Sequence, residues 1–261
     1  MFKLECTLTI LTKIVELVWI LINVFDKYLK KLSDSFYQYV KEIEKVLSIA
    51  APLAIGELIL SAAYNYFDRF TIKASYWEWR IATSDLAMLF LIDLLRLFFS
   101  IFVGTSTTLT LFRYLSISDN EKKNFNGSSE VFNNIKKAVL FLIFGLKVFL
   151  KLFSSLFSGS FVQLFKETFF AGILYAQGLK ENESLEKSKE LGKSKGEEIK
   201  WFLVVSLVFS VGFYLAIWTF AQILSVFTIL NPFISDLVFI PIMALFYFNF
   251  FVECGGEKKI L

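Results

Sequence analysis

Seven ionisable side chains interrupt long apolar runs of the sequence, and they are the residues through which the chain could do chemistry. If these runs are transmembrane helices, a rise of about 1.5 Å per residue places all seven in one layer, roughly 10–17 Å from the outer membrane face. Charged groups at that depth are costly to bury, so they are candidates for a functional site. The candidates are Glu57, Asp93, Arg96, Lys147, Lys151, Lys166 and Glu167.

The spacing of the candidates predicts how they pair. Asp93 and Arg96 are three residues apart, so they share a helix face. The same holds for Lys147 and Lys151, which are four residues apart. Glu167 is expected at a matching depth on the next antiparallel helix, which predicts an ion pair with Lys147 or Lys151. Two interpretations remain open: ion pairs that hold helices together, or a hydrated, outward-facing cavity for an ion, a proton relay or a lipid headgroup.

Missing residue types limit the chemistry. There is no His among the 261 residues, which excludes His-dependent hydrolysis and His-ligated zinc or haem. Cys6 and Cys254 stand at opposite ends of the chain in no metal-ligand spacing, so we expect two unpaired thiols. The formal net charge of +3 is too small to predict nucleic-acid binding. We therefore expect no enzymatic activity, no cofactor, no metal and no nucleic-acid partner.

The elements that must position the candidates are six apolar runs, typical of a chain that crosses a bilayer repeatedly. Apolar residues make up 56% of the sequence and charged residues 20%. Backbone polar groups in lipid must be bonded within each segment, so the runs are predicted to be α-helices. The expected fold is an all-α, polytopic bundle of six spanning helices, at residues 46–66, 86–112, 138–154, 161–178, 201–227 and 234–252.

Another apolar run, at residues 8–25, precedes these six. Its polar residues recur at helical spacing, so they form one stripe of a helix. That helix either lies in the membrane interface or crosses the membrane as a seventh span. The predicted organisation is an N-terminal amphipathic helix and basic linker at 1–45, a six-helix domain at 46–252 and a short cytoplasmic tail at 253–261.

The basic residues predict the orientation of the chain. Residues 26–45, 113–137, 179–200 and 253–261 hold 18 of the 27 Lys and Arg residues, and the stretches at the opposite span ends hold four. We call the first set the basic side, and we expect it to be cytoplasmic in a multi-pass protein of the cell membrane. The opposite side carries the residues of an expected aromatic belt, Tyr76, Trp77 and Trp79.

A highly charged segment at residues 180–200 is also predicted to be helical. Its glutamates come early and its lysines late, which suits the helix dipole. Two interpretations are open: a connector in solvent or along the lipid headgroups, or a docking helix for a soluble cytoplasmic partner.

The order of the elements resembles a known family. Arg113, a charged loop and a hairpin lead to a basic segment that carries Ser188 and, three positions later, Leu191. A long helix and a last helix with Pro241 complete the pattern. It resembles the uncharacterised six-helix prokaryotic integral membrane proteins that are similar to the membrane domain of some glycerophosphodiester phosphodiesterases. The resemblance implies a fold and a membrane location, and it implies no active site.

Two functions are therefore compatible with the sequence. The first is a non-catalytic membrane scaffold or envelope-maintenance protein whose charges hold the bundle together. The second is a small transporter or lipid-handling protein that uses a charged, outward-facing cavity within the membrane. Membrane lipids are the expected partners in either case.

The orientation is testable by cysteine labelling. We expect cysteines introduced at Asn126 and Asn182, both in basic-side loops, to resist a membrane-impermeant thiol reagent in intact cells. The same positions should react once the membrane is permeabilised. Labelling of either position in intact cells would reverse the predicted topology.

Overall fold

A computed structural model describes residues 22–23, 25–78, 83–223 and 226–257 of the chain, and this part is helical and contains no strand. Within it, five helices are long and apolar enough to cross a membrane: Ile43–Tyr66, Phe90–Ser116, Ile135–Leu156, Gly196–Phe220 and Leu230–Glu253. The predicted all-α fold is confirmed. The run at 8–25 lies almost wholly outside the described residues, as does Trp79, and the side chains of Tyr76 and Trp77 are not described.

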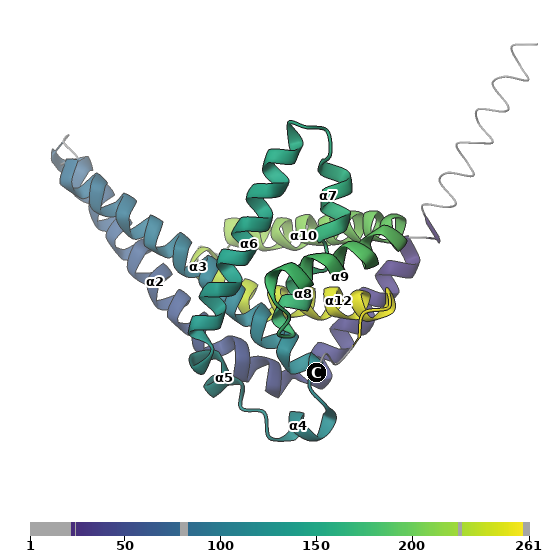
Figure 1. Cartoon of the computed structure of the whole chain (residues 1–261). Coiled ribbons are helices and arrows are strands. Elements are labelled where there is room, and N and C mark those ends of the chain that lie inside the picture. The colour runs from purple at the N-terminus through teal and green to yellow at the C-terminus, as the bar shows by residue number, and fades with distance from the viewer. Residues whose placement is uncertain (1–21, 24, 79–82, 224–225, 258–261) are drawn as a thin grey trace, which may run out of the picture.

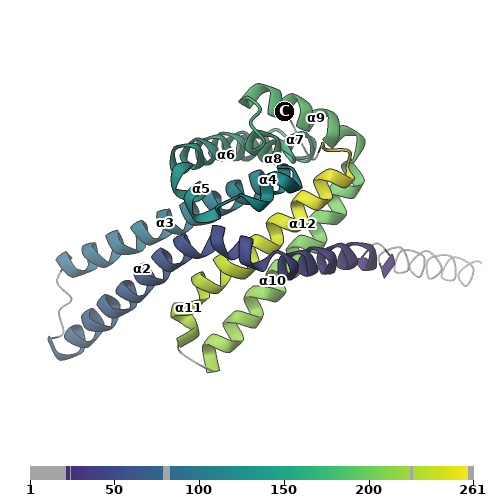
Figure 2. The same ribbon diagram turned by 90° about the horizontal axis from the view of Figure 1, so that it is seen from below.

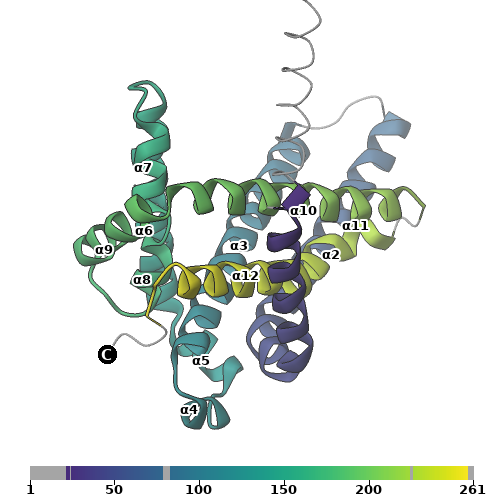
Figure 3. The same ribbon diagram turned by 90° about the vertical axis from the view of Figure 1, so that its right-hand side faces the viewer.

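Three hairpins organise the helices, and Figure 1 shows two of them as projecting arms. The arms are α2–α3 and α6–α7, and Figures 2 and 3 show the third hairpin, α10–α11, pointing in another direction. The helices approach one another at the ends away from the hairpin connections. The elements are α2 (Ile43–Glu78), α3 (Thr83–Ser116), α4 (Asp119–Lys123), α5 (Gly127–Asn133), α6 (Ile135–Leu156), α7 (Phe161–Thr168), α8 (Ala171–Ala176), α9 (Glu181–Ser194), α10 (Gly196–Ile223), α11 (Val226–Ile234), the π-helix η1 (Ser235–Phe239) and α12 (Ile240–Glu253).

Aromatic side chains form the core where the helix ends converge. Phe202 of α10 stacks on Phe250 and Phe246 of α12, with ring centroids 4.4 and 4.5 Å apart. Phe170 joins the same cluster, 5.5 Å from Phe251. All of these Phe side chains are buried. The high Phe content of the sequence therefore serves in part to pack helix ends together.

The predicted span at 161–178 is not one continuous helix. The chain turns at Phe169 and Phe170, which divides it into α7 and α8, and neither piece is long enough to cross a membrane. Hydroxyl groups from other helices bond the backbone at the break. The Phe170 N–H donates to Ser188 Oγ at 3.0 Å, and the Tyr247 hydroxyl donates to the Phe169 carbonyl.

One face of α9, which forms most of the charged segment at residues 180–200, is buried against the rest of the molecule. Ser184, Ser188 and Gly192 recur every four residues on this face, and α9 packs with it against α7 and α8. A Cβ atom at Gly192 would lie only 1.9 Å from the Lys166 carbonyl oxygen. Small residues therefore allow the two backbones to approach closely. The charged face of α9 remains exposed.

Residues 25–41 are helical rather than an extended linker. Their buried side chains, Tyr28, Leu32, Ser35 and Tyr39, recur at helical spacing and lie in the core. The Tyr28 ring contacts Phe250 edge-on. This part of the predicted N-terminal region is thus packed on the bundle.

Cys254 is a buried, free cysteine at the end of α12. Burial raises the pKa of its thiol to about 11, so the reactive thiolate is scarce at neutral pH. Cys6 lies outside the described residues.

A proline in α2 creates a backbone carbonyl that another segment must bond. Pro52 has no N–H to donate to the Ser48 carbonyl, four positions earlier. The Ser128 hydroxyl of α5 donates to this carbonyl at 2.9 Å. The contact fixes α5 against α2.

The second such proline lies beside the π-helix. Pro241 cannot donate to the Leu237 carbonyl, and the Tyr39 hydroxyl donates to it at 3.0 Å. Burial raises the pKa of Tyr39, which keeps this hydroxyl protonated as a donor. Residues 25–41 thereby support the helix turn that carries Asp236.

Removal of this hydroxyl should destabilise the fold. We expect Tyr39→Phe to lower the free energy of unfolding by about 1 kcal/mol, because the Leu237 carbonyl loses a partner in a buried site. Tyr37→Phe is the matched control, since Tyr37 is 72% exposed. Thermal unfolding in detergent measures both. Equal midpoints for the two variants would show that the contact contributes nothing.

Candidate functional site

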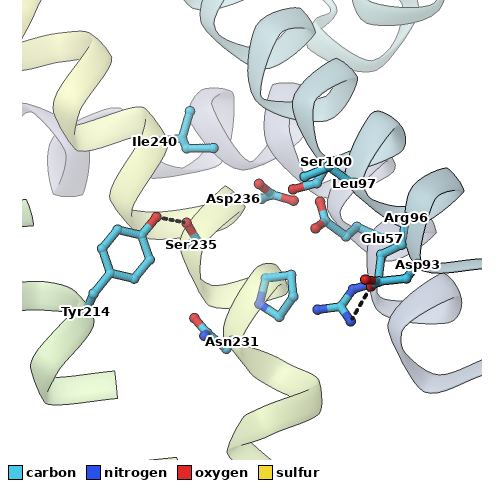
Figure 4. Close-up of a pocket in the computed structure, with 11 residues that line it drawn as sticks. Glu57, Asp93, Arg96, Leu97, Ser100, Tyr214, Asn231, Ser235, Asp236 and Ile240 are labelled. Atoms are coloured by element: carbon cyan, nitrogen blue, oxygen red, sulfur yellow. Dashed lines mark hydrogen bonds and ion pairs between the residues drawn. The ribbon is translucent and has the colours of Figure 1, made fainter. Parts of the chain in front are cut away.

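A pocket of about 360 Å³ lies between α2, α3, α10 and the α11–η1 segment (Figure 4). It is placed within the candidate spans, in the half nearer the hairpin connections. The sequence-predicted candidates Glu57, Asp93 and Arg96 line it together. The other lining residues are Leu97, Ser100, Tyr214, Asn231, Pro232, Ser235, Asp236 and Ile240.

Two buried carboxyl groups form the inner part of the pocket. Glu57 is 1% exposed and Asp236 is 3% exposed. Their side chains point toward each other, placed so that one carboxyl can hydrogen-bond the other when it carries a proton (Figure 4). One carboxyl oxygen of each, Oε2 and Oδ2, is buried and without a hydrogen-bond partner in the described part of the chain. Buried polar atoms without partners are rare and costly, so they mark a place where a ligand is expected.

The π-helix η1 sets the position of Asp236. A π-helical turn widens the helix and changes the direction of its side chains, and such turns are frequent at functional sites. The neighbouring Ser235 hydroxyl lies 3.2 Å from the Tyr214 hydroxyl, a hydrogen bond that ties η1 to α10. With Tyr39 on the Leu237 carbonyl, this turn is held from two sides.

An ion pair stands at the mouth of the pocket. Arg96 Nη1 lies 3.9 Å from Asp93 Oδ1, which confirms the pairing predicted from their spacing. The Arg96 guanidinium also lies over the Tyr64 ring, 5.2 Å from its centroid. The Asp93 side chain is 62% exposed, so this pair is far more accessible than Glu57 and Asp236.

The pocket carries excess negative charge. It is lined by three carboxyl groups and one guanidinium. Two carboxylates facing each other in a poorly solvated site repel, so the pair favours a shared proton or a bound cation. In the described part of the chain, no group of three or more His, Cys, Asp or Glu side chains is arranged to hold a metal ion. Two facing carboxyl groups can share one proton or attract a cation.

The other four candidates lie elsewhere, and the predicted pairing of Glu167 with Lys147 or Lys151 is wrong. Glu167 pairs instead with Lys189 of α9, at 3.7 Å. Lys147 pairs with Glu181, at 2.9 Å. The physical reason is the break after α7, which lets α9 fold back and supply both counter-charges.

Lys151 and Lys166 also take no part in the pocket. Lys151 is exposed, with no ion-pair partner among the described residues. The Lys166 side chain packs beside Gly196, where a Cβ atom would lie 2.9 Å from Lys166 Nζ. The seven candidates therefore form no single charged layer.

Asp236 is the charged pocket residue that the sequence analysis missed. It lies inside the expected run at 234–252, where it was counted as part of an apolar helix. A usable signal was present: an acidic residue between two nearby prolines, Pro232 and Pro241. Prolines interrupt helices and free backbone groups, so a carboxyl between them is a candidate binding residue.

Comparisons of the chain with protein-family models, curated proteins and solved structures find no match. The resemblance to the membrane domain of glycerophosphodiester phosphodiesterases therefore stays a prediction. The fold itself fits the class of all-helical, multi-pass membrane proteins, since five apolar helices are long enough to span.

Neutralising either buried carboxyl should stabilise the protein. We expect Glu57→Gln and Asp236→Asn each to raise the free energy of unfolding by roughly 1 kcal/mol, because the repulsion and desolvation of a second carboxylate disappear. The gain is measured at pH 6 and at pH 9, because two facing carboxyl groups repel each other only when both are charged. Thermal unfolding at both pH values measures it.

The matched control is Glu44→Gln, the same substitution at an exposed position of the same helix, α2. It should change stability little and equally at both pH values. Destabilisation by Glu57→Gln and Asp236→Asn at both pH values would contradict like-charge repulsion in the pocket.

Proposed function

We propose that the protein is a small membrane transporter that binds and releases a proton or a monovalent cation at Glu57 and Asp236. The observation that carries this proposal is the pair of buried carboxyl oxygens without partners, next to an open pocket inside the candidate spans. An intramembrane carboxyl pair of this kind must be neutralised by a ligand that can enter from the pocket.

The π-helical turn at the site supports this proposal. Single π-helical turns inside α-helices are frequent at functional sites. Here α11, η1 and α12 follow one another as one helical segment that contains a candidate span. The π-helical turn of this segment carries Asp236. A widened turn can relax more easily than a regular helix, which suits a site that must load and unload.

The charges favour a transporter over the scaffold that the sequence also allowed. Ion pairs that hold helices together need opposite charges, whereas Glu57 and Asp236 are both acidic and have no cationic partner within the described residues. They cost stability rather than supply it. The excess of carboxyl groups also favours a cation over an anionic lipid headgroup as the occupant.

The distribution of basic residues in the sequence indicates which membrane face the pocket opens to. The pocket lies toward the hairpin connections, and the basic residues collect at the other ends of the spans. We propose that the pocket opens to the outer face of the cell membrane.

The function is tested by cation-driven proton release. Purified full-length protein in weakly buffered detergent, with a pH-sensitive dye, should release about one proton per chain when NaCl, KCl or LiCl is added. Choline chloride serves as the salt control. Glu57→Gln and Asp236→Asn should abolish the signal, and Glu44→Gln should keep it.

A site that binds only protons gives a different positive result. Between pH 6 and pH 10, wild type should then take up one proton more than Glu57→Gln or Asp236→Asn in a potentiometric titration. No cation-driven release, together with equal proton uptake by wild type and both variants, would overturn the proposal.

A further inference from the structure

A second cavity, of about 550 Å³, lies on the basic side of the molecule and is independent of the Glu57–Asp236 site. It is formed by the end of α3, the start of α6 and the chain between α8 and α9, which lie close together in Figure 1. We call it the basic pocket. Its position at the ends of two candidate spans places it at the level of the lipid headgroups.

Three cationic side chains line the basic pocket: Arg113, Lys137 and Lys180. Arg113 pairs with Glu130 at 3.4 Å, and the one acidic lining residue, Glu181, is held by Lys147. Lys137 and Lys180 are exposed and have no ion-pair partner among the described residues. The pocket therefore carries cationic charge that its own surroundings do not neutralise.

The same pocket has a charged rim and an apolar floor. Arg113 lies in the last turn of its span and Lys137 in the first turn of the next. One helix turn deeper on each helix, Leu109 and Leu140 line the cavity. Tyr175 adds to this floor, where its ring stacks on Phe144 with centroids 4.6 Å apart. This arrangement matches an amphiphile with an anionic head and apolar chains.

A hydrogen-bond acceptor among the pocket residues indicates that the anionic head of the ligand also carries a hydrogen-bond donor. Gln177 lines the cavity, and its Nε2 donates to Ser116 Oγ and to the Glu257 carbonyl, each at 3.1 Å. Its Oε1 is buried and has no partner in the described part of the chain. A hydroxyl group on the ligand would supply the missing donor.

We propose that the basic pocket binds an anionic phospholipid with a hydroxylated headgroup, of the phosphatidylglycerol type. The phosphate lies among Arg113, Lys137 and Lys180, a headgroup hydroxyl donates to Gln177 Oε1, and the acyl chains continue along Leu109. Basic pockets between transmembrane helices on the cytoplasmic side are suited to such headgroups.

The proposal is tested by lipid binding to the purified full-length protein in detergent, followed by native mass spectrometry. Dioleoylphosphatidylglycerol should give a one-to-one complex at concentrations where dioleoylphosphatidylcholine gives none. Lys137→Gln and Lys180→Gln should each weaken its binding about fivefold, because each removes one cationic contact at the membrane surface. Lys136→Gln, the exposed neighbour that does not line the pocket, should keep wild-type affinity.

Two further binding experiments test whether the bound anion belongs to a lipid and whether its headgroup hydroxyl is recognised. Inorganic phosphate should not compete at equal concentration, and competition by it would overturn the lipid in favour of a free anion. Phosphatidylmethanol, an anionic phosphodiester of the same charge without the headgroup hydroxyl, should bind more weakly than phosphatidylglycerol to wild type but equally to Gln177→Leu. Equal binding of dioleoylphosphatidylglycerol and dioleoylphosphatidylcholine would overturn the proposed site. Equal weakening of binding by Lys136→Gln and Lys137→Gln would also overturn it.

Discussion

The structure depends on one constraint: every backbone polar group within the apolar interior needs a hydrogen-bond partner, including those at helix breaks. Pro52 and Pro241 lie within continuous helical segments, each leaves one carbonyl without its helical donor, and each of these carbonyls accepts a hydrogen bond from a hydroxyl of a distant segment. The break at Phe169–Phe170 is bonded in the same way by Ser188 and Tyr247. Hydroxyl side chains therefore determine which elements are held together, in addition to the aromatic core.

This constraint explains why the candidate site can exist. Glu57 and Asp236 place two acidic groups in a buried position, and this costs stability. The turn that carries Asp236 keeps its conformation because Tyr39 and Tyr214 bond it from opposite sides. Residues at functional sites commonly oppose stability, and the surrounding packing must compensate. Here the aromatic core around Phe202 lies at the other end of the helices and supplies that packing.

The two cavities are chemically opposite and lie toward opposite ends of the spans. The pocket around Asp236 is lined mainly by carboxyl groups, and the basic pocket around Lys137 is lined mainly by cationic groups. The carboxyl-lined pocket lies away from the basic side and the cation-lined pocket lies on it, so the charge asymmetry along the spans is also present in the lining of the two cavities.

The sequence by itself determined the helical class, most of the spans and the local Asp93–Arg96 pair, because apolar run length and helical spacing are properties of neighbouring residues. It also singled out Glu57, which lines a pocket together with Asp93 and Arg96. The tertiary structure decided which charged residues far apart in the sequence are in contact. Asp236 faces Glu57, and Glu167 forms an ion pair with Lys189. Those contacts depend on where helices break and fold back. Hydroxyl groups far along the chain bond the backbone at the Phe169–Phe170 break and the carbonyls freed by the two prolines, and spacing along one helix contains no information about that.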